Sequence, residues 1–333
     1  MIIKKCICIN EEKMKRNPKF DNVRVTAIFI IVLGHFLVYC TPHSGIGRYC
    51  GGGGYSLFFF LSALLYGLKW HSNGKQRFET LPYMRKRIIK LGSSVWPFLA
   101  ILIILFMLMG VDFSPVSAVL NFCFMGYLWK LPGNGHLWFL TIIMLCYMMF
   151  SFLSRVKVSN MVLYGIMLVG LVFFLVLESL GIPGHSFMTL AICAVLFTKA
   201  DQVLSLVNTI SKTIWIPGIL LFNTVSMFLF MNGLFEQSRI ATYLLINIIG
   251  LSWLILFMAV SPRAKNSIVT FISGISFEIY IVHHTLCAGP LYSVCELGFD
   301  IISSFLVLIV FSIILGYILH FISKQIEVII CIR

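Results

Sequence analysis

The residues best suited to chemistry lie on one face of the first long apolar stretch. Arg24 and His35 are eleven positions apart, which is within about 20° of three full turns of an α-helix, and about 16 Å along its axis. Asp21 lies near the same stripe. Ionisable residues inside a membrane span are costly, so they indicate a functional site by default. The simpler alternative is an arginine that orients the span and a histidine satisfied in the core.

A late apolar stretch carries a second polar face. Ser276, Tyr280 and His283 recur at the i, i+4 and i+7 positions of one helix face. His283 lies about as deep from the inner side as His35. Glu278 in the same stretch needs a partner in lipid. We expect these residues to bind a substrate or to orient His35; the alternative is that Glu278 only holds helices together.

Two further groups are candidates for contact with a donor substrate. Arg85, Arg87 and Lys90 form a basic run, and because arginine pairs well with phosphate, this run could clamp a nucleotide-bearing donor. Simple attraction to anionic lipid headgroups is the alternative. Trp138 opens another apolar stretch just after His136. A tryptophan at a span end is ordinarily an interfacial anchor, and the functional alternative is a contact with the donor.

The composition requires that membrane-spanning helices hold these residues. Of the 333 residues, 59% are hydrophobic and only 11% are charged, and the mean hydropathy is +0.98; about 25% of an ordinary soluble domain is charged. In lipid every backbone polar group must be satisfied internally, which leaves helices or a closed barrel. The apolar runs are unbroken rather than alternating as in barrel strands. We therefore predict an all-α polytopic membrane protein.

The chain is expected to cross the membrane about ten times. Segment 114–129 is shorter and would form a re-entrant or interfacial helix. Residues 1–19 would be a cytoplasmic extension, residues 20–325 the transmembrane domain and residues 326–333 a cytoplasmic tail. A span needs about 20 apolar residues, and we assign the spans to 22–41, 54–70, 93–110, 136–154, 160–178, 185–199, 213–230, 240–260, 271–291 and 300–322.

The basic residues orient these spans. Lysine and arginine collect in cytoplasmic loops. With the N-terminus inside, all of the 25 basic residues except Arg48, Lys130 and Arg239 fall in inner segments. Both ends are therefore predicted to be cytoplasmic. The basic residues of these inner segments account for the net charge of +13. Because no basic stretch is interleaved with exposed aromatic residues, we expect no nucleic-acid partner.

The ten cysteines show no metal-binding pattern. None forms a CxxC pair, and no Cys/His cluster has zinc spacing, so no metal is expected. Most cysteines lie inside apolar runs, where they behave as small buried hydrophobic residues. A disulfide between Cys50 and Cys295 in the outer loops is an alternative that no spacing favours.

The same places carry a resemblance to a known family. Arg24 and His35, with ten residues between them, resemble the first-span motif of the acyltransferase-3 family of membrane O-acyltransferases. In that motif an aspartate precedes the arginine by three residues, here Asp21. The resemblance covers roughly residues 16–325. Its other matching segments are the glycine- and phenylalanine-rich stretch 54–63, the basic run 85–90, Trp138–Phe139–Leu140 with Tyr147, and Ser276, Tyr280 and His283.

The resemblance implies a ten-helix core and acetylation of sugars on bacterial surface polysaccharides. We expect acyl transfer, in the inner membrane, from cytoplasmic acyl-CoA (acetyl-CoA) to a hydroxyl of a surface or exported glycan. The partners would be acyl-CoA, a carbohydrate acceptor, lipid and glycan-assembly proteins, with no tightly bound cofactor. His35 would be the general base and Asp21 would pair with Arg24. The donor site would contain Arg24, Arg85, Arg87, Lys90 and Trp138; the acceptor site would contain Ser276, Glu278, Tyr280 and His283.

The sequence leaves three alternatives open. A base-catalysed direct transfer and a relay through an acyl-histidine are equally compatible with His35. A transporter or exporter of a glycan intermediate would also have ten spans and buried polar residues. A scaffold for envelope assembly would use the same residues as structural contacts only.

Overall fold

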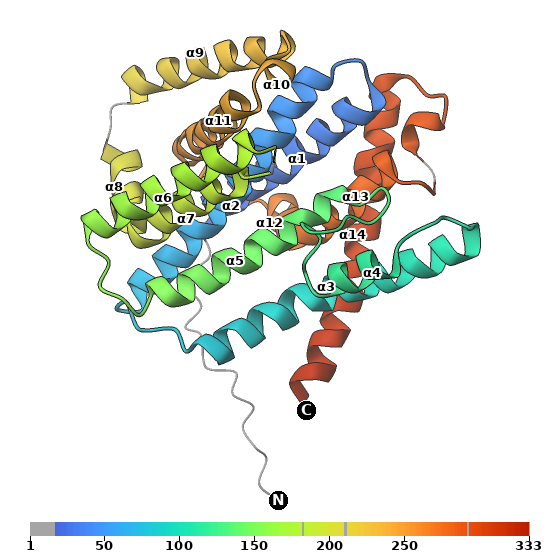
Figure 1. Cartoon of the computed structure of the whole chain (residues 1–333), viewed down its shortest axis with the longest axis horizontal. Helices are drawn as coiled ribbons and strands as arrows, with labels where there is room; N and C mark the ends of the chain where they lie inside the picture. Colours follow the sequence, from blue (N-terminus) through green and yellow to red (C-terminus); the bar gives the residue numbers. More distant parts are fainter. Residues whose placement is uncertain (1–16, 182, 210–211, 292, 333) are drawn as a thin grey trace, which may run out of the picture.

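The computed structural model describes residues 17–181, 183–209, 212–291 and 293–332 (Figure 1). This part of the chain contains helices and connecting turns and no strand, which confirms the all-α prediction. Residues 1–16, most of the predicted cytoplasmic extension, lie outside the described residues.

The first half of the chain forms a hairpin, a third long helix and a short connecting region. The elements are α1 (Pro18–Cys40), α2 (Ser44–Ser72), α3 (Thr80–Met109), α4 (Pro115–Phe122), η1 (Gly135–Leu137) and α5 (Trp138–Leu153). Of the predicted interfacial segment 114–129, only α4 is helical.

The second half adds nine α-helices and one short 3₁₀ turn. The elements are α6 (Asn160–Ser179), α7 (His185–Thr198), α8 (Ala200–Thr209), α9 (Lys212–Met231), α10 (Leu234–Gln237), α11 (Arg239–Val260), α12 (Ser267–Gly274), α13 (Ser276–Ala288), η2 (Val294–Glu296) and α14 (Ile301–Ile332). Because α14 continues to Ile332, the predicted boundary at residue 325 coincides with no break in the helix.

Each predicted span coincides with a helix or with a bent pair of helices. In the described residues, seven helices are long and apolar enough to cross a bilayer, and two bent pairs raise that number to nine. The apolar helix over Trp215–Met231, in α9, is shorter. The chain is therefore a multi-pass membrane protein.

Two bends were not predicted. The helix axis turns by 81° between α7 and α8, so the span predicted over 185–199 ends in a separate, more polar helix. It turns by 68° between α12 and α13, which breaks the span predicted over 271–291. Gly274 and its serine neighbours lie at that break, and Gly/Ser pairs are a recognised cause of sharp kinks.

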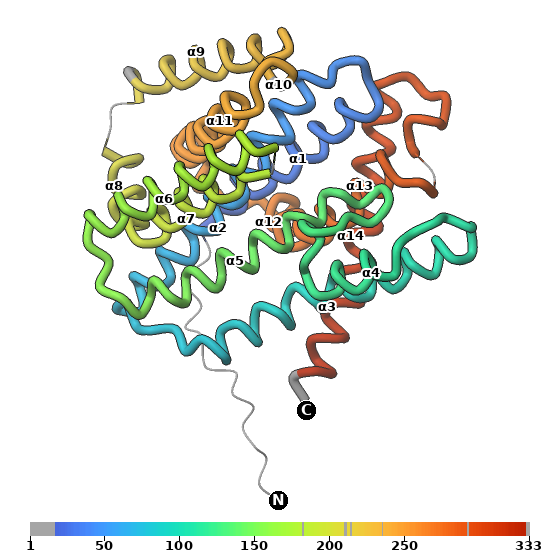
Figure 2. The backbone as a smooth tube through the Cα atoms, in the orientation of Figure 1, coloured from blue at the N-terminus to red at the C-terminus, as the bar shows by residue number. Residues whose placement is uncertain are grey.

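A disulfide and an ion pair join three connections at one edge of the bundle. Cys40 at the end of α1 is bonded to Cys295 in η2, so the alternative pairing of Cys295 with Cys50 is wrong. The α1–α2 and α13–α14 connections accordingly lie side by side in Figures 1 and 2. Arg48 near the start of α2 binds Glu236 of α10, and this contact lowers the pKa of the Glu236 carboxyl.

Two lysine contacts lie at the edge of the bundle opposite to the disulfide. Lys19 Nζ at the start of α1 donates to the Met258 carbonyl near the end of α11, at 3.1 Å. Lys212 Nζ at the start of α9 donates to the neighbouring Ala259 carbonyl, at 3.0 Å. Because α1 separates Lys19 from Cys40 by its whole length, these contacts and the disulfide lie at opposite ends of the helix.

Small residues bring α1 and α2 into close contact. A Cβ atom added to Gly34 would lie 2.3 Å from the Gly51 backbone nitrogen. Such contacts between small residues are typical of helix pairs in membranes. The close approach fixes the rotation of α1 and therefore the direction in which the next residue, His35, points.

Candidate active site

A direct contact between two histidines forms the centre of the candidate site. His35 Nδ1 in α1 lies 2.8 Å from His283 Nε2 in α13. His283 is fully buried, whereas His35 is partly exposed. The sequence analysis had placed both residues at similar depth, and the structure brings them together.

The backbone around His283 determines which nitrogen of each ring carries a proton. His283 Nδ1 lies 2.8 Å from the Tyr280 carbonyl, which only accepts, so Nδ1 must carry the proton. In the neutral ring, Nε2 of His283 is then an acceptor, and His35 Nδ1 donates to it. The second nitrogen of a neutral His35, Nε2, is left with a free lone pair.

Two histidines without a predicted role complete a four-histidine cluster of His35, His136, His283 and His284. The rings of His136 and His284 are stacked, with centroids 4.5 Å apart. The His35 and His284 rings meet edge to face at 4.7 Å. Four of the eight histidines in the chain thus gather from α1, η1 and α13. The signal available in the sequence was the adjacency of His284 to His283 and the position of His136 before Trp138.

Main-chain carbonyls hold the outer rings of the cluster. His284 Nδ1 donates to the Gly133 carbonyl at 2.7 Å, and His136 Nε2 donates to the Ile281 carbonyl at 3.0 Å. The Tyr280 hydroxyl donates to the His136 carbonyl at 2.8 Å. His136 and Tyr280 therefore fasten the η1 segment to α13.

At the N-terminal end of α1, Asp21 and Arg24 meet a serine that was not predicted. Ser273 Oγ donates to Asp21 Oδ1 at 2.8 Å and accepts from Arg24 Nη1 at 3.2 Å. The carboxylate and guanidinium are 4.0 Å apart. Ser276 donates to the Ser273 carbonyl at 3.0 Å. The α12–α13 break thus supplies the serine that joins the predicted pair.

Arg24 and His35 lie on the same face of α1. Arg24 contacts Ser273 of α12, and His35 contacts His283 of α13. The helical periodicity that suggested a shared face therefore agrees with the contacts. The two side chains face one pair of helices, Arg24 from near the start of α1 and His35 from nearer its end.

Glu278 lies apart from the cluster. Its Oε1 atom accepts from Ser94 of α3 at 3.0 Å and from His320 of α14 at 3.1 Å. Ser94 is bonded in turn to Ser323. Glu278 faces α3 and α14, so the structure does not bring it together with Tyr280 and His283, the residues with which it was grouped.

The three side chains of the predicted basic run have different surroundings. Arg87 lies over the rings of Tyr66, Tyr83 and Tyr147, at 4.7, 5.1 and 5.7 Å from the ring centroids. Arg85 is exposed, and Lys90 lies 4.0 Å from Glu327 of α14. These residues therefore do not form one clamp in this structure.

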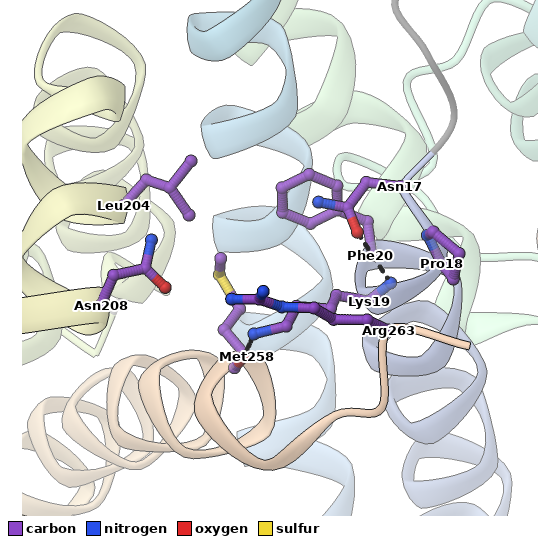
Figure 3. Close-up of a pocket in the computed structure, with 8 residues that line it drawn as sticks. All are labelled: Asn17, Pro18, Lys19, Phe20, Leu204, Asn208, Met258 and Arg263. Carbon is purple, nitrogen blue, oxygen red and sulfur yellow. Dashed lines mark hydrogen bonds between the residues drawn. The ribbon is translucent and has the colours of Figure 1, made fainter. Parts of the chain in front are cut away.

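A pocket of about 410 Å³ opens at the edge defined by Lys19 (Figure 3). Lys19 and Arg263 give it a basic lining. Its other lining residues are Asn17, Pro18, Phe20, Leu204, Asn208 and Met258. The pocket is near the N-terminal end of α1 but does not include Arg24.

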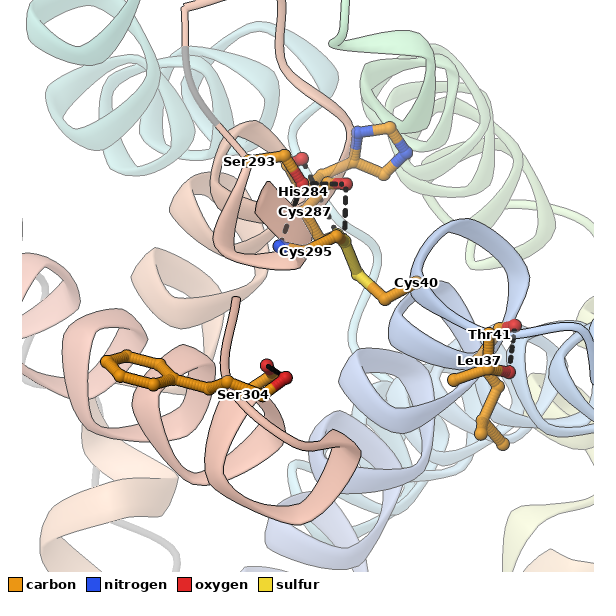
Figure 4. Close-up of a disulfide and its surroundings, with 9 residues drawn as sticks. Leu37, Cys40, Thr41, His284, Cys287, Ser293, Cys295 and Ser304 are labelled. Atoms are coloured by element: carbon orange, nitrogen blue, oxygen red, sulfur yellow. Dashed lines mark hydrogen bonds between the residues drawn. A yellow bond between two sulfur atoms is a disulfide. The ribbon is translucent and has the colours of Figure 1, made fainter. Parts of the chain in front are cut away.

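The Cys40–Cys295 disulfide lies near the cluster. Figure 4 shows it beside Cys287 and His284 of α13. It joins the helix that carries His35 to the segment that follows His284. The disulfide therefore restrains the two elements that the histidine contact requires.

The cluster does not have the arrangement of a metal site. Within the described ranges, no group of three or more His, Cys, Asp or Glu residues is placed to hold a metal ion. Carbonyl groups engage one nitrogen of each of His136, His283 and His284. The rings are thus arranged for hydrogen bonding.

A family model described as an acyltransferase domain matches residues 17–321. The chain belongs to the acyltransferase-3 family. No curated protein and no solved structure gives a significant match. The match spans α1 to most of α14, so the acyltransferase domain contains the whole histidine cluster. Membership in this family supports a membrane acyltransferase and argues against the alternative of a glycan exporter.

An acyltransferase needs a base or nucleophile and access for two substrates. In this acyltransferase, His35 alone of the four clustered histidines is partly exposed. Its Nδ1 is engaged by His283, which leaves Nε2 for a substrate. His35 is therefore the member of the cluster best placed to react.

Proposed function

We propose that this acyltransferase transfers an acetyl group from cytoplasmic acetyl-CoA to a hydroxyl of a surface or exported glycan. The reaction would take place in the inner membrane. The observation that carries the proposal is the 2.8 Å contact between His35 Nδ1 and His283 Nε2. It supports an unprotonated Nε2 on a partly exposed His35.

In direct transfer, His35 acts as a general base. Its Nε2 takes the proton of the acceptor hydroxyl while the oxygen attacks the thioester carbonyl. The new C–O ester bond forms, the C–S bond breaks, and the CoA thiolate leaves and takes up the proton. His283 orients the ring and stabilises the imidazolium that forms transiently.

In the alternative, His35 Nε2 attacks the thioester itself. The C–S bond breaks, the CoA thiolate leaves, and an acetyl-imidazolium remains on His35. The acceptor hydroxyl then attacks its carbonyl, the C–O bond forms as the C–N bond breaks, and the hydroxyl proton passes to the thiolate or to solvent. The same lone pair serves both routes. A rapid burst of CoA release in the absence of an acceptor would support the acyl-enzyme, and release only with an acceptor would support direct transfer.

The donor is proposed to enter from the edge of the bundle that contains Lys19. Arg24 lies at this end of α1, and the basic pocket with Lys19 and Arg263 opens nearby. Phosphate groups of CoA favour such positively charged surroundings. The thioester would then reach along α1 towards His35, about 16 Å from Arg24 for eleven helical residues.

The contacts at the two edges support ten crossings. Lys212 places the start of α9 at the edge of Lys19, whereas Glu236 places the segment after α9 at the edge of the α1–α2 turn. The short helix α9 would therefore cross. Because stable disulfides belong to oxidising compartments, the edge with Cys40 is proposed to face outwards, with both termini inside.

The test replaces His35 by alanine and measures acetyl transfer from acetyl-CoA in membranes. We expect a loss of about 100-fold or more, as for other general bases. His43→Ala is the matched control because His43 lies in the exposed α1–α2 turn. Normal activity in His35→Ala, at equal expression, would refute the proposed chemistry.

A further inference from the structure

A second polar group lies between the ends of α6, α7 and α11. The side chain of Glu178 is fully buried. Its Oε1 accepts from the Gly184 backbone N–H at 2.8 Å, and its Oε2 lies 3.3 Å from Arg239 Nη2. The family motifs quoted above include none of these residues. A buried carboxylate is costly even when paired, so it is a candidate functional group.

Aromatic rings surround this carboxylate. His185, 3.7 Å from Glu178, is stacked on Tyr243 with ring centroids 4.3 Å apart. Trp138 meets His185 edge to face at 5.5 Å, and Tyr55 meets Trp138 in the same way at 5.2 Å. Four helices, α2, α5, α7 and α11, thus contribute rings to one place.

Buried polar atoms without hydrogen bonds are concentrated at the same place. In the part of the chain that the structure describes, Tyr55 Oη and Ser186 Oγ are among the buried atoms without a hydrogen bond. Glu178 Oε2 and His185 Nδ1 also lack a hydrogen bond and are held by ion-pair contacts alone, to Arg239 at 3.3 Å and to Glu178 Oε1 at 3.7 Å. Folded proteins leave few buried polar groups unsatisfied, and each one calls for an explanation such as a ligand. The two hydroxyl groups of Tyr55 and Ser186, beside a carboxylate and an imidazole that make no hydrogen bond through these atoms, point to a polar molecule that binds there.

The group adjoins the histidine cluster on one side. Trp138 follows His136 by two positions, and the Phe139 ring lies 4.8 Å from that of Tyr280. Arg239 starts α11 directly after α10, whose Glu236 binds Arg48. The group therefore lies towards the edge of the α1–α2 turn, opposite to the Lys19 pocket.

We infer that Tyr55, Trp138, Glu178, His185, Ser186 and Tyr243, here called the outer aromatic site, bind a sugar ring of the acceptor. The inference rests on the proposed function and deepens it. Aromatic faces would pack against the C–H groups of the sugar, and the carboxylate, imidazole and hydroxyl groups would bond its hydroxyls. This assigns Trp138 to the acceptor, whereas the sequence analysis had assigned it to the donor.

The charges favour a sugar over the nucleotide of CoA. The Glu178 carboxylate lies at the centre of the site and would repel a phosphate, and it already neutralises Arg239. The basic pocket at Lys19 is at the other edge. A neutral polyhydroxylated ring supplies hydrogen bonds to Tyr55 Oη and Ser186 Oγ without adding charge.

The decisive variants are Ser186→Ala and Tyr55→Phe. Each removes a hydroxyl that has no hydrogen bond in the described structure, so neither should lower the melting temperature. Ser312→Ala is the matched control, because Ser312 Oγ in α14 is also buried without a hydrogen bond. Glu178→Gln tests the carboxylate, with the exposed Glu296→Gln as its control.

The assay uses membranes, acetyl-CoA and acceptor oligosaccharides. The oligosaccharides are prepared from the surface polysaccharide of cells that carry the gene, after mild base has removed the esters of that polysaccharide. We expect Ser186→Ala and Tyr55→Phe to raise the KM for the oligosaccharides about 5- to 20-fold. This range is typical of one lost polar contact. The KM for acetyl-CoA should stay within about twofold, and Ser312→Ala should match the wild type.

The outcomes separate the two levels of the proposal. If the wild type transfers acetyl but the KM for the oligosaccharides is unchanged in both hydroxyl variants, the outer aromatic site is refuted and the proposed function stands. If both KM values rise together, the site is not selective for the acceptor, and the inference is likewise refuted. If the wild type acetylates none of the oligosaccharides, both the function and the inference fail.

Discussion

At the scale of single residues, the site depends on which nitrogen each histidine protonates. His283 donates to the Tyr280 carbonyl, so it can only accept from His35. This chain of donors and acceptors leaves His35 Nε2 unprotonated. In the proposed reaction, His283 is therefore a positioning residue, which would act on the substrates through His35.

We predict that His283→Leu lowers kcat by about 10-fold or more, since a ring without its orienting partner presents the wrong tautomer for part of the time. His283→Gln should retain more activity, because its amide oxygen can still accept from His35. The KM for acetyl-CoA should not change in either variant. Equal losses in the leucine and glutamine variants would mean that His283 matters only for packing.

A variant of Ser273 tests the contacts at the N-terminal end of the same face of α1. It bonds both Asp21 and Arg24, and hydrogen bonds to charged groups are worth about 1.5–3 kcal/mol. We predict that Ser273→Ala raises the KM for acetyl-CoA about 10-fold, because Arg24 loses the group that positions it. Steady-state kinetics at saturating acceptor would check this. Ser179→Ala, at the exposed end of α6, is the control, and a KM unchanged by Ser273→Ala would assign Arg24 to structure alone.

At the scale of elements, close packing and breaks in helices position the reactive residues. The apolar runs predicted every long helix, because length and composition suffice for that. The break at Gly274 and the helix α8 could not be predicted, because continuous apolar sequence does not reveal a bend. The pairing of Cys40 with Cys295 spans 255 positions, and such distant contacts have no local signal.

The α1–α2 contact gives a prediction for packing. Gly34→Ala would place Cβ against the Gly51 backbone, and overpacking costs about 1–3 kcal/mol. We expect a lower melting temperature in detergent and lower acetyl transfer, because α1 must rotate or move and His35 with it. Gly165→Ala in α6 is the control, since its added Cβ meets no atom within 4 Å. Equal melting temperatures for the two variants would contradict the close contact.

The disulfide gives a second prediction at this scale. Cys40→Ser and Cys295→Ser should each lower the melting temperature to the same extent, by the equivalent of about 2–4 kcal/mol. Reduction of the wild type should reproduce the effect. Cys50→Ser should behave as the wild type, because Cys50 is not bonded. A large effect of Cys50→Ser, or none of Cys40→Ser, would show that the bond is absent in the membrane.

At the scale of the whole molecule, the two ends of the bundle differ in chemistry. The basic pocket and Arg24 lie at one edge, whereas the disulfide and the outer aromatic site lie towards the other. The sequence predicted the candidate residues on α1 and α13 through helical periodicity. It could not predict that Glu278 faces α3 or that Glu178 gathers aromatic rings, because four or more helices must pack before those neighbours exist.

This polarity requires that the short helix α9 cross the membrane, which labelling with an impermeant maleimide would test. In a Cys123→Ala background, which removes an exposed thiol, we predict that Lys130→Cys is labelled in intact cells. Lys157→Cys and Lys265→Cys should be labelled only after permeabilisation, because in the proposed topology both follow an even number of crossings from a cytoplasmic N-terminus. Labelling of Lys265→Cys in intact cells, with Lys157→Cys still protected, would show that α9 does not cross, and donor and acceptor would then no longer approach from opposite sides.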